Sequence, residues 1–190
     1  MDSIVQSLHT LETSLTMLGS RASTFQGKLE DLLFRAQKMA QKAKNNLPET
    51  DTMYSYDVQH LRHQLRDLSN QVETLPTAVG ELERIAVPDA ATNGPAQSVS
   101  RLATTLGRSL ALLHEHALLA AQHIRSAEHK VEAWYLVQET EQMSEKAKAT
   151  AGVTQRLALK TAPAPAPASP APAPVQPPTR PSNPTPGSAV

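Results

Sequence analysis

The sequence contains no cysteine and very few aromatic residues. Without cysteine the chain cannot form a disulfide framework, use a thiolate nucleophile or bind zinc through thiolates. Aromatic residues make up only 3% of the chain, and the apolar residues are mainly leucine and alanine. This composition favours helical seams over a thick globular core, so a large enclosed active site is not expected.

The chain also lacks an excess of charge of one sign and any long hydrophobic run. The 18 basic and 18 acidic residues balance, so no net field draws the protein onto nucleic acid. No apolar stretch approaches the roughly 20 residues of a membrane span, and Met1–Ile4 has no basic residue of a secretory signal. We expect a cytoplasmic protein with neither a membrane span nor a nucleic-acid partner.

What the sequence does contain is a long heptad repeat in residues 1–46. Its apolar residues follow one another at alternating steps of four and three, which is the 3.5-residue period of a coiled-coil helix. Asn45-Asn46 before Pro48 should end this helix, and residues 47–57 then form a connection. The repeat places these residues on one seam: Ile4, Leu8, Leu11, Leu15, Leu18, Ala22, Phe25, Leu29, Leu32, Ala36, Met39 and Ala43.

The same spacing resumes over residues 58–87, from Val58 to Ala86, and predicts a second heptad helix. Pro76 lies inside this pattern without changing its phase, which predicts a kink or a short restart. Val87-Pro88 should end the helix. The segment 88–97 contains Asn93-Gly94-Pro95 and is predicted to be a connection.

A third helix is predicted over residues 98–151, with an apolar stripe that runs from Val99 to Trp134. Two successive steps of four at Leu102, Leu106 and Leu110 form a stutter in the repeat. Beyond this helix, residues 152–190 are rich in proline and alanine, with 11 of the 15 prolines after Thr161. This composition predicts a disordered tail with polyproline II character.

The predicted fold is all-α: three long amphipathic helices in an elongated coiled-coil or helical bundle. At about 1.5 Å per residue the helices would be roughly 60, 45 and 80 Å long, so one short bundle could not cover every seam. We therefore expect pairing with other coiled-coil proteins or with a second copy, and a charge at Leu15 should disrupt that assembly. The expected partner-binding residues are Leu8, Leu11, Leu15, Leu18, Phe25, Leu29, Leu32, Met39, Leu110, Leu113, Ile124, Val131 and Trp134.

The sequence offers no recognisable catalytic machinery. It has no phosphate-binding glycine loop and no nucleophile elbow, and its carboxylate pairs are typical of solvated helix faces. His60 and His63 are three residues apart, but no third ligand accompanies them, so neither a metal nor a cofactor is expected. The end of the first helix is basic, which suits the helix dipole and could alternatively meet an acidic partner. We predict that the protein is not an enzyme.

Two further features bear on binding. Trp134, the single tryptophan, is followed by Tyr135, and such aromatic residues serve either in a core or as interface anchors. In the tail, Pro174 and Pro177 form a minimal PxxP with Arg180 nearby, which suggests either a spacer or a weak SH3-type contact.

The segment Arg84-Ile85-Ala86-Val87-Pro88-Asp89-Ala90, with Val131 and Trp134 late in a long helix, resembles the small coiled-coil shoulder subunits of dynactin. The resemblance covers the helical part and not the alanine-proline tail. It implies a non-catalytic subunit of the dynein activator that packs in a helical bundle with partner subunits. We therefore expect a subunit of a cytoskeletal or microtubule-motor complex; the alternative is a scaffold of a vesicle-tethering, nuclear-pore or kinetochore complex.

Overall fold

The computed structural model describes residues 2–48, 51–125 and 127–163, and within them all regular structure is helical. The all-α prediction is therefore confirmed, but the predicted number of three helices is wrong. The described residues form four helices: α1 (Asp2–Lys44), α2 (Tyr54–Ile85), α3 (Ala90–His123) and α4 (Ala127–Thr161).

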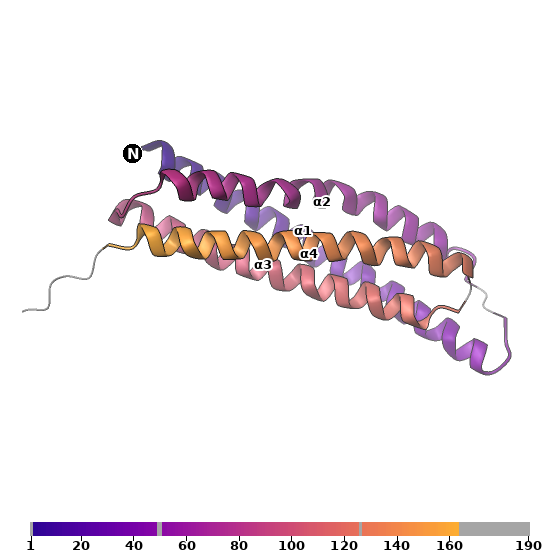
Figure 1. Cartoon of the computed structure of the whole chain (residues 1–190). Coiled ribbons are helices and arrows are strands. Elements are labelled where there is room, and N and C mark those ends of the chain that lie inside the picture. The colour runs from indigo at the N-terminus through magenta and orange to yellow at the C-terminus, as the bar shows by residue number, and fades with distance from the viewer. Residues whose placement is uncertain (1, 49–50, 126, 164–190) are drawn as a thin grey trace, which may run out of the picture.

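The helices lie side by side and alternate in direction (Figure 1), so the beginning of α1 and the end of α4 share one end of the bundle. Each helix has two neighbours: α1 packs on α2 and α3, and α4 packs on α2 and α3. Among the described residues, no Cα atoms of the diagonal pairs α1–α4 and α2–α3 lie within 8 Å of each other. The α1–α2 interface is much less extensive than the other three.

Polar contacts fix the register of the antiparallel pair α1–α2. They recur every seven residues forward along α1 and every seven residues backward along α2. The pairs are Arg21 Nη1 with Gln71 Oε1 at 3.1 Å, Lys28 Nζ with Gln64 Oε1 at 2.7 Å and Arg35 Nη1 with Asp57 Oδ2 at 2.6 Å. Because apolar seams of the same period lie beside them, these contacts reinforce one register.

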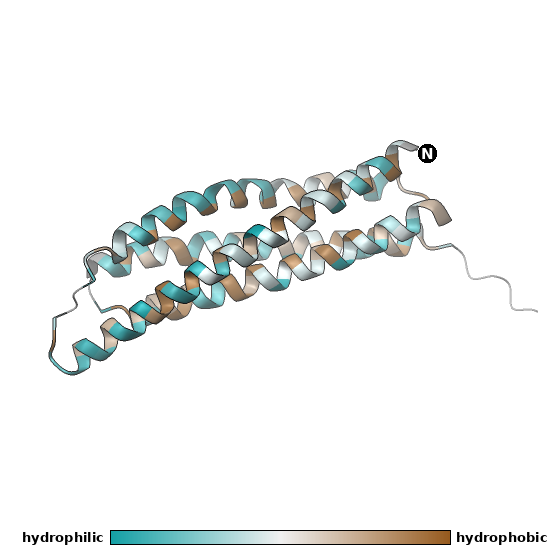
Figure 2. Ribbon diagram, turned by 180° about the vertical axis from the view of Figure 1, so that it is seen from behind, coloured by the Kyte–Doolittle hydropathy of each residue, from teal (hydrophilic) through white to brown (hydrophobic). Residues whose placement is uncertain are grey.

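The heptad seams of the first two helices form much of the core. In α1 every seam position from Leu8 to Met39 is buried, while Ile4 and Ala43 at the two ends are only partly covered. In α2 the buried positions run from Tyr54 to Val79. Figure 2 shows hydrophobic and hydrophilic residues alternating along each helix, as expected when one side of each helix faces the core.

The predicted third helix of residues 98–151 is in fact two helices, because the chain leaves helical geometry after His123. Ile124 has φ −84° and ψ 129°, an extended conformation that ends α3 and lets α4 turn back along it. α1 is therefore about 65 Å long and the other helices are about 48 to 53 Å long. Their similar lengths let the chain cover its own seams, so the expectation that one bundle could not cover every seam is wrong.

The predicted connection at 88–97 is also wrong, since α3 already begins at Ala90. Asp89 caps it: its side chain accepts from the N–H of Ala91 at 3.1 Å. Gly94 and Pro95 lie in the second turn, where the proline removes one helical hydrogen bond. The cap alone is too weak to offset these helix breakers, and the burial of Ala96 and Val99 supplies the rest. α2 begins at Tyr54 rather than at residue 58 and continues through Pro76 without the restart that was one alternative.

Part of the predicted tail of residues 152–190 is helical. Residues 152–161 belong to α4, so the prediction that the tail starts at residue 152 is wrong; the rest of the tail, residues 164–190, lies outside the described residues. The end of α4 is tied to the start of α3 because the N–H of Asp89 donates to the carbonyl of Thr161 at 3.2 Å. No helix within the described residues is both long enough and apolar enough to cross a membrane.

Candidate interaction surface

Three neighbouring side chains near the start of α4 are exposed although they are large and mostly apolar. Val131 is 53% exposed, Trp134 43% and Tyr135 46%. Positions i, i+3 and i+4 lie next to one another on a helix, so these residues form one continuous apolar surface. We call Val131, Trp134 and Tyr135 the α4 aromatic surface.

The break between α3 and α4 explains why this surface faces outward. Apolar spacing alone would continue the stripe of α3 through Val131 and Trp134. Because α4 is a separate helix, it turns a different face to the core, which contains Ala133, Leu136 and Val137. The residues that extend the apparent stripe consequently point away from it.

The α4 aromatic surface is slightly hollowed. A shallow depression of ≈ 360 Å³ is lined by Val131, Trp134 and Tyr135 together with Lys130 and Gln138. All five residues belong to α4, so the depression lies on the outer side of a single helix. Exposed aromatic side chains flanked by polar ones are typical of protein interaction sites.

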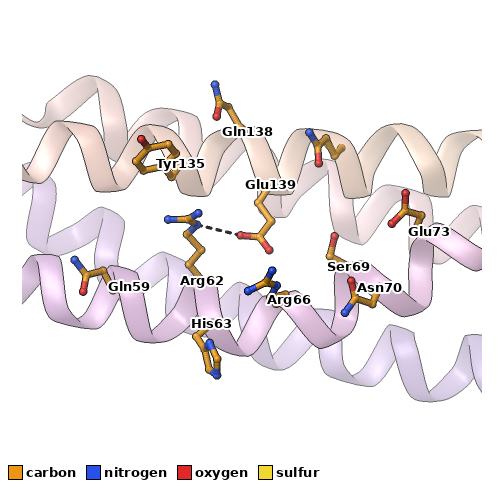
Figure 3. A pocket seen from close by; sticks show the side chains of 11 residues that line it. Gln59, Arg62, His63, Arg66, Ser69, Asn70, Glu73, Tyr135, Gln138 and Glu139 are labelled. Carbon is orange, nitrogen blue, oxygen red and sulfur yellow. Dashed lines mark ion pairs between the residues drawn. The ribbon is translucent and has the colours of Figure 1, made fainter.

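Tyr135 also borders a polar groove between α2 and α4, of ≈ 580 Å³ (Figure 3). Arg62 of α2 lies over its ring, with the guanidinium carbon 4.7 Å from the ring centre, a cation–π arrangement. The same arginine places Nε 3.4 Å from Oε2 of Glu139 on α4. Tyr135 is therefore held by a neighbouring helix, while its exposed side stays available.

Burial raises the pKa of Glu139, and the nearby Arg62 partly offsets that rise. The remaining lining of the groove mixes both charges with amides and one hydroxyl. It consists of Gln59, His63, Arg66, Ser69, Asn70, Glu73, Gln138 and Gln142. With charges of both signs, the groove has no marked preference for an anion or a cation.

A cluster of polar residues holds this end of the bundle together. Arg35 of α1 pairs with Asp51 and with Asp57, and its guanidinium carbon lies 5.6 Å from the centre of the buried Tyr54 ring. His129 of α4 lies against the same ring, with the two ring centres 5.7 Å apart, and its Nδ1 is 2.5 Å from Ser55 Oγ. The start of α4, and with it the α4 aromatic surface, is thereby fixed on α1 and α2.

The cluster shifts the acidity of its members. The hydrogen bond from Arg35 holds the pKa of Asp51 below its usual range, although burial opposes this. Burial raises the pKa of Tyr54, so its hydroxyl stays neutral. The cluster therefore combines a charged pair with a neutral tyrosine, which is an arrangement for holding helices together.

Most of the predicted partner-binding residues lie in the core of this chain. The expectation that its seams stay uncovered is wrong, because α3 and α4 fold back on the first two helices. Only Val131 and Trp134 of the predicted set are exposed. The buried members are Leu8, Leu11, Leu15, Leu18, Phe25, Leu29, Leu32, Met39, Leu110, Leu113 and Ile124.

The other candidate residues have local roles in the bundle. Arg35, part of the predicted basic end of α1, is paired with two carboxylates of the same chain. His60 stacks on Tyr56 and contacts Gln64, with Nε2 atoms 2.9 Å apart. In the described part of the chain, no three His, Cys, Asp or Glu residues are grouped as a metal site would require.

Two elements of this surface could not be predicted from the sequence. Tyr135 was noted only as a neighbour of Trp134, and the pairing of its ring with Arg62 joins residues far apart in the chain, for which a single sequence holds no signal. Glu139 was assigned to a solvated face, but its side chain is only 17% exposed. Comparisons with protein-family models, with curated proteins and with solved structures found no match for this chain.

Proposed function

We propose that the protein is a non-catalytic helical subunit of a multiprotein complex that docks on its partner through the α4 aromatic surface. The observation that carries this proposal is the continuous exposure of Val131, Trp134 and Tyr135 on a bundle whose own core is already filled. Because the surface is not needed to close the core, its apolar area contributes stability only when something outside the four-helix bundle covers it.

The geometry supports a rigid docking site. Tyr135 is held from one side by Arg62, and the start of α4 is fixed by the contacts of His129 with Tyr54 and Ser55. A pre-positioned aromatic pair loses little conformational entropy on binding, which is why tryptophan and tyrosine dominate interface hot spots. The polar groove beside the surface would form its rim.

For the identity of the complex we propose a cytoplasmic, microtubule-motor-associated assembly of the dynactin type. The support is the resemblance of Arg84–Ala90, Val131 and Trp134 to dynactin shoulder subunits. Val131 and Trp134 also belong to the α4 aromatic surface. In this proposal the bundle forms within one chain and the partner covers its exterior, whereas the sequence alone predicted that partners share the heptad seams.

Affinity purification of the tagged full chain from its native cells tests both parts. The wild-type protein should recover a defined set of proteins in constant proportion, and Trp134→Ser should lose them. Phe34→Ser is the matched control, since Phe34 is 63% exposed on α1 away from this surface. Recovery that is unaffected by Trp134→Ser, or lost equally in Phe34→Ser, would overturn the docking proposal.

The composition of the recovered set decides the complex. Dynein and dynactin components support the motor-associated assembly. Vesicle-tethering, nuclear-pore or kinetochore proteins that are lost in Trp134→Ser would support the alternative scaffold role and reject the dynactin type.

A further inference from the structure

One line of exposed and partly exposed positions runs along the outside of α4, from its end back to the α4 aromatic surface. Leu159, which is 77% exposed, follows Trp134 by about seven helical turns at 3.6 residues per turn, so the two share one face of the helix. Gly152 follows Trp134 by about five turns and lies on the same line, where a Cβ atom would meet nothing within 4 Å. We call this line the outer track of α4.

The proline-rich part of the chain begins where this track ends. α4 closes at Thr161, and residues 164–190 carry ten prolines and a single charged side chain, Arg180. Such sequences favour polyproline II, which is extended, has no internal hydrogen bonds and therefore loses little entropy on binding. Proline-rich segments in this conformation are recognised by surfaces lined with exposed tryptophan and tyrosine.

We propose that residues 164–190 of the chain fold back along the outer track and occupy the α4 aromatic surface as a polyproline II ligand. The tether favours this occupant over a free peptide, because attachment to the same helix raises its local concentration. The inference concerns the surface of the proposed function but needs no partner protein. It assigns that surface a ligand class and an intramolecular competitor.

The length of α4 and the length of an extended tail together determine which tail residues reach Trp134 and Tyr135. Trp134 lies about 40 Å before Thr161 along α4, at 1.5 Å per residue. A polyproline II chain rises about 3.1 Å per residue, so about 13 residues span this distance. Counted from residue 164, where the proposed ligand begins, the segment that reaches the two rings is Gln176-Pro177-Pro178. Since Arg180 is the only charge nearby in the tail, the contact should be apolar and insensitive to salt.

Contact quenching tests this register in the full chain. The chain has no cysteine and one tryptophan, so a single introduced cysteine can carry a bimane dye whose emission is quenched by contact with Trp134. The dye at Gln176→Cys should be strongly quenched. It should regain its emission when Trp134→Leu is added. Ser188→Cys, beyond the contact point, is the matched control and should stay bright.

Each outcome decides the proposal. Equal emission from positions 176 and 188, or quenching at 176 that survives Trp134→Leu, would overturn it. Quenching at 176 that vanishes on dilution would also overturn it, and would assign the surface to the tail of a second copy. Raising the salt concentration should leave the quenching unchanged, whereas its loss in salt would contradict an apolar contact.

A measurement without a dye guards against an effect of the label. In the unlabelled chain, the double substitution Pro177→Gly and Pro178→Gly should make Trp134 more accessible to acrylamide and shift its emission to the red. Pro184→Gly with Pro186→Gly, beyond the contact point, should leave both unchanged. Equal accessibility in all three proteins would overturn the proposal.

These results are separate from the test of the proposed function. If the tail does not reach Trp134, the loss of partners in Trp134→Ser still stands on its own. If the tail docks and no partner depends on Trp134, the surface serves the tail alone. If both hold, the Pro177→Gly and Pro178→Gly variant should recover more of the partner than the wild-type chain.

Discussion

Arg35 and Asp51 form a two-point ion pair, with Nε 2.7 Å from Oδ2 and Nη2 2.8 Å from Oδ1. The pair joins α1 to the segment that leads into α2, and Asp57 takes the remaining side of the guanidinium. The fork of an arginine matches a carboxylate in this geometry, and both side chains are about three-quarters covered. The contact therefore fixes the turn between the first two helices.

Asp51→Asn is expected to lower the free energy of unfolding by about 1 kcal/mol, since it removes the charge from a two-point pair near the surface. Chemical denaturation at neutral pH measures this change. The exposed Asp67 provides the control, and Asp67→Asn should have little effect. Equal losses in the two variants would show that the geometry of the pair contributes nothing specific.

The same pair predicts a pH dependence of stability. Arg35 lowers the pKa of Asp51 in the folded chain, so folding is favoured by the ionised carboxylate. This contribution is fully present above the unfolded pKa of about 4 and is lost as the pH falls through the lower folded pKa. Denaturation curves measured from pH 6 down to acid should fall less steeply for Asp51→Asn than for wild type; parallel curves would contradict the linkage.

Two glycines in α1 offer a gain in stability. A Cβ atom at Gly19 or Gly27 would meet nothing within 4 Å, and both positions have ordinary helical backbone. Gly19→Ala and Gly27→Ala should each raise the free energy of unfolding by about 0.5–1 kcal/mol, because alanine loses less backbone entropy on folding. Thermal unfolding followed by circular dichroism measures the change.

The reverse substitution, from alanine to glycine, checks whether backbone entropy is the cause. Ala149 is exposed within α4, and Ala149→Gly should lose stability by a similar amount. A loss of stability in Gly27→Ala would mean that the added methyl group disturbs the neighbouring groove between α1 and α2, which Gly27 helps to line.

The heptad spacing predicted α1 and α2 well, because their seams consist mainly of leucine and valine and nearly all of these seam positions are buried. The C-terminal end of α1 also followed from the sequence: Asn46, expected to stop the helix, has φ 55° and occupies the left-handed position that closes it. Here the local preferences and the packing agree, so a single sequence is sufficient.

The break between α3 and α4 could not be predicted from apolar spacing, because Ile124, Val131 and Trp134 continue the stripe of α3 across it. No glycine or proline marks the break. The available signal was Ser126 followed by Glu128, a residue type that caps helices and an acidic residue suited to a first turn. The continuous apolar spacing outweighed this signal. For the same reason Val131 and Trp134, which are exposed, were expected to lie on a contact seam.

The core face of α4 was missed because it is largely made of alanine, threonine and serine. Five threonine or serine residues there are buried, and four of them bond backbone carbonyls of their own helix. Their hydroxyl groups need no partner outside α4, so they can face the core like small apolar residues. Hydropathy alone cannot recognise such a seam.

A charge in the α1 seam should now unfold the chain itself. Leu15 is 1% exposed within this bundle, so Leu15→Glu would bury a carboxylate without a partner and should cost about 4 kcal/mol or more. Met17, two residues away, is 59% exposed, and Met17→Glu should change stability by less than about 0.5 kcal/mol. Circular dichroism and sedimentation of both variants measure this.

The two measurements separate the two accounts of this seam. If Leu15→Glu keeps its helical content and its melting temperature but loses a larger assembly, the seam binds another chain and the four-helix bundle described here is not the state in solution. Loss of helical content in the isolated chain, with Met17→Glu unaffected, agrees with the bundle.

The register of α4 makes the sharpest prediction, since two adjacent residues should respond in opposite ways to the same substitution. Thr150 is 0% exposed, while Ala149 is exposed. Thr150→Glu would place a charge in the core and should lower the free energy of unfolding by about 3 kcal/mol or more. Ala149→Glu should change it by less than about 0.5 kcal/mol, because the side chain extends into solvent.

Urea denaturation of the two variants checks the prediction. A continuous third helix that kept the stripe of α3 would bury neither residue, so both variants would then be equally stable. A large loss at Ala149 with tolerance at Thr150 would mean that α4 is rotated about its axis. Trp134 and Tyr135 would in that case turn toward the core, and the α4 aromatic surface would not exist.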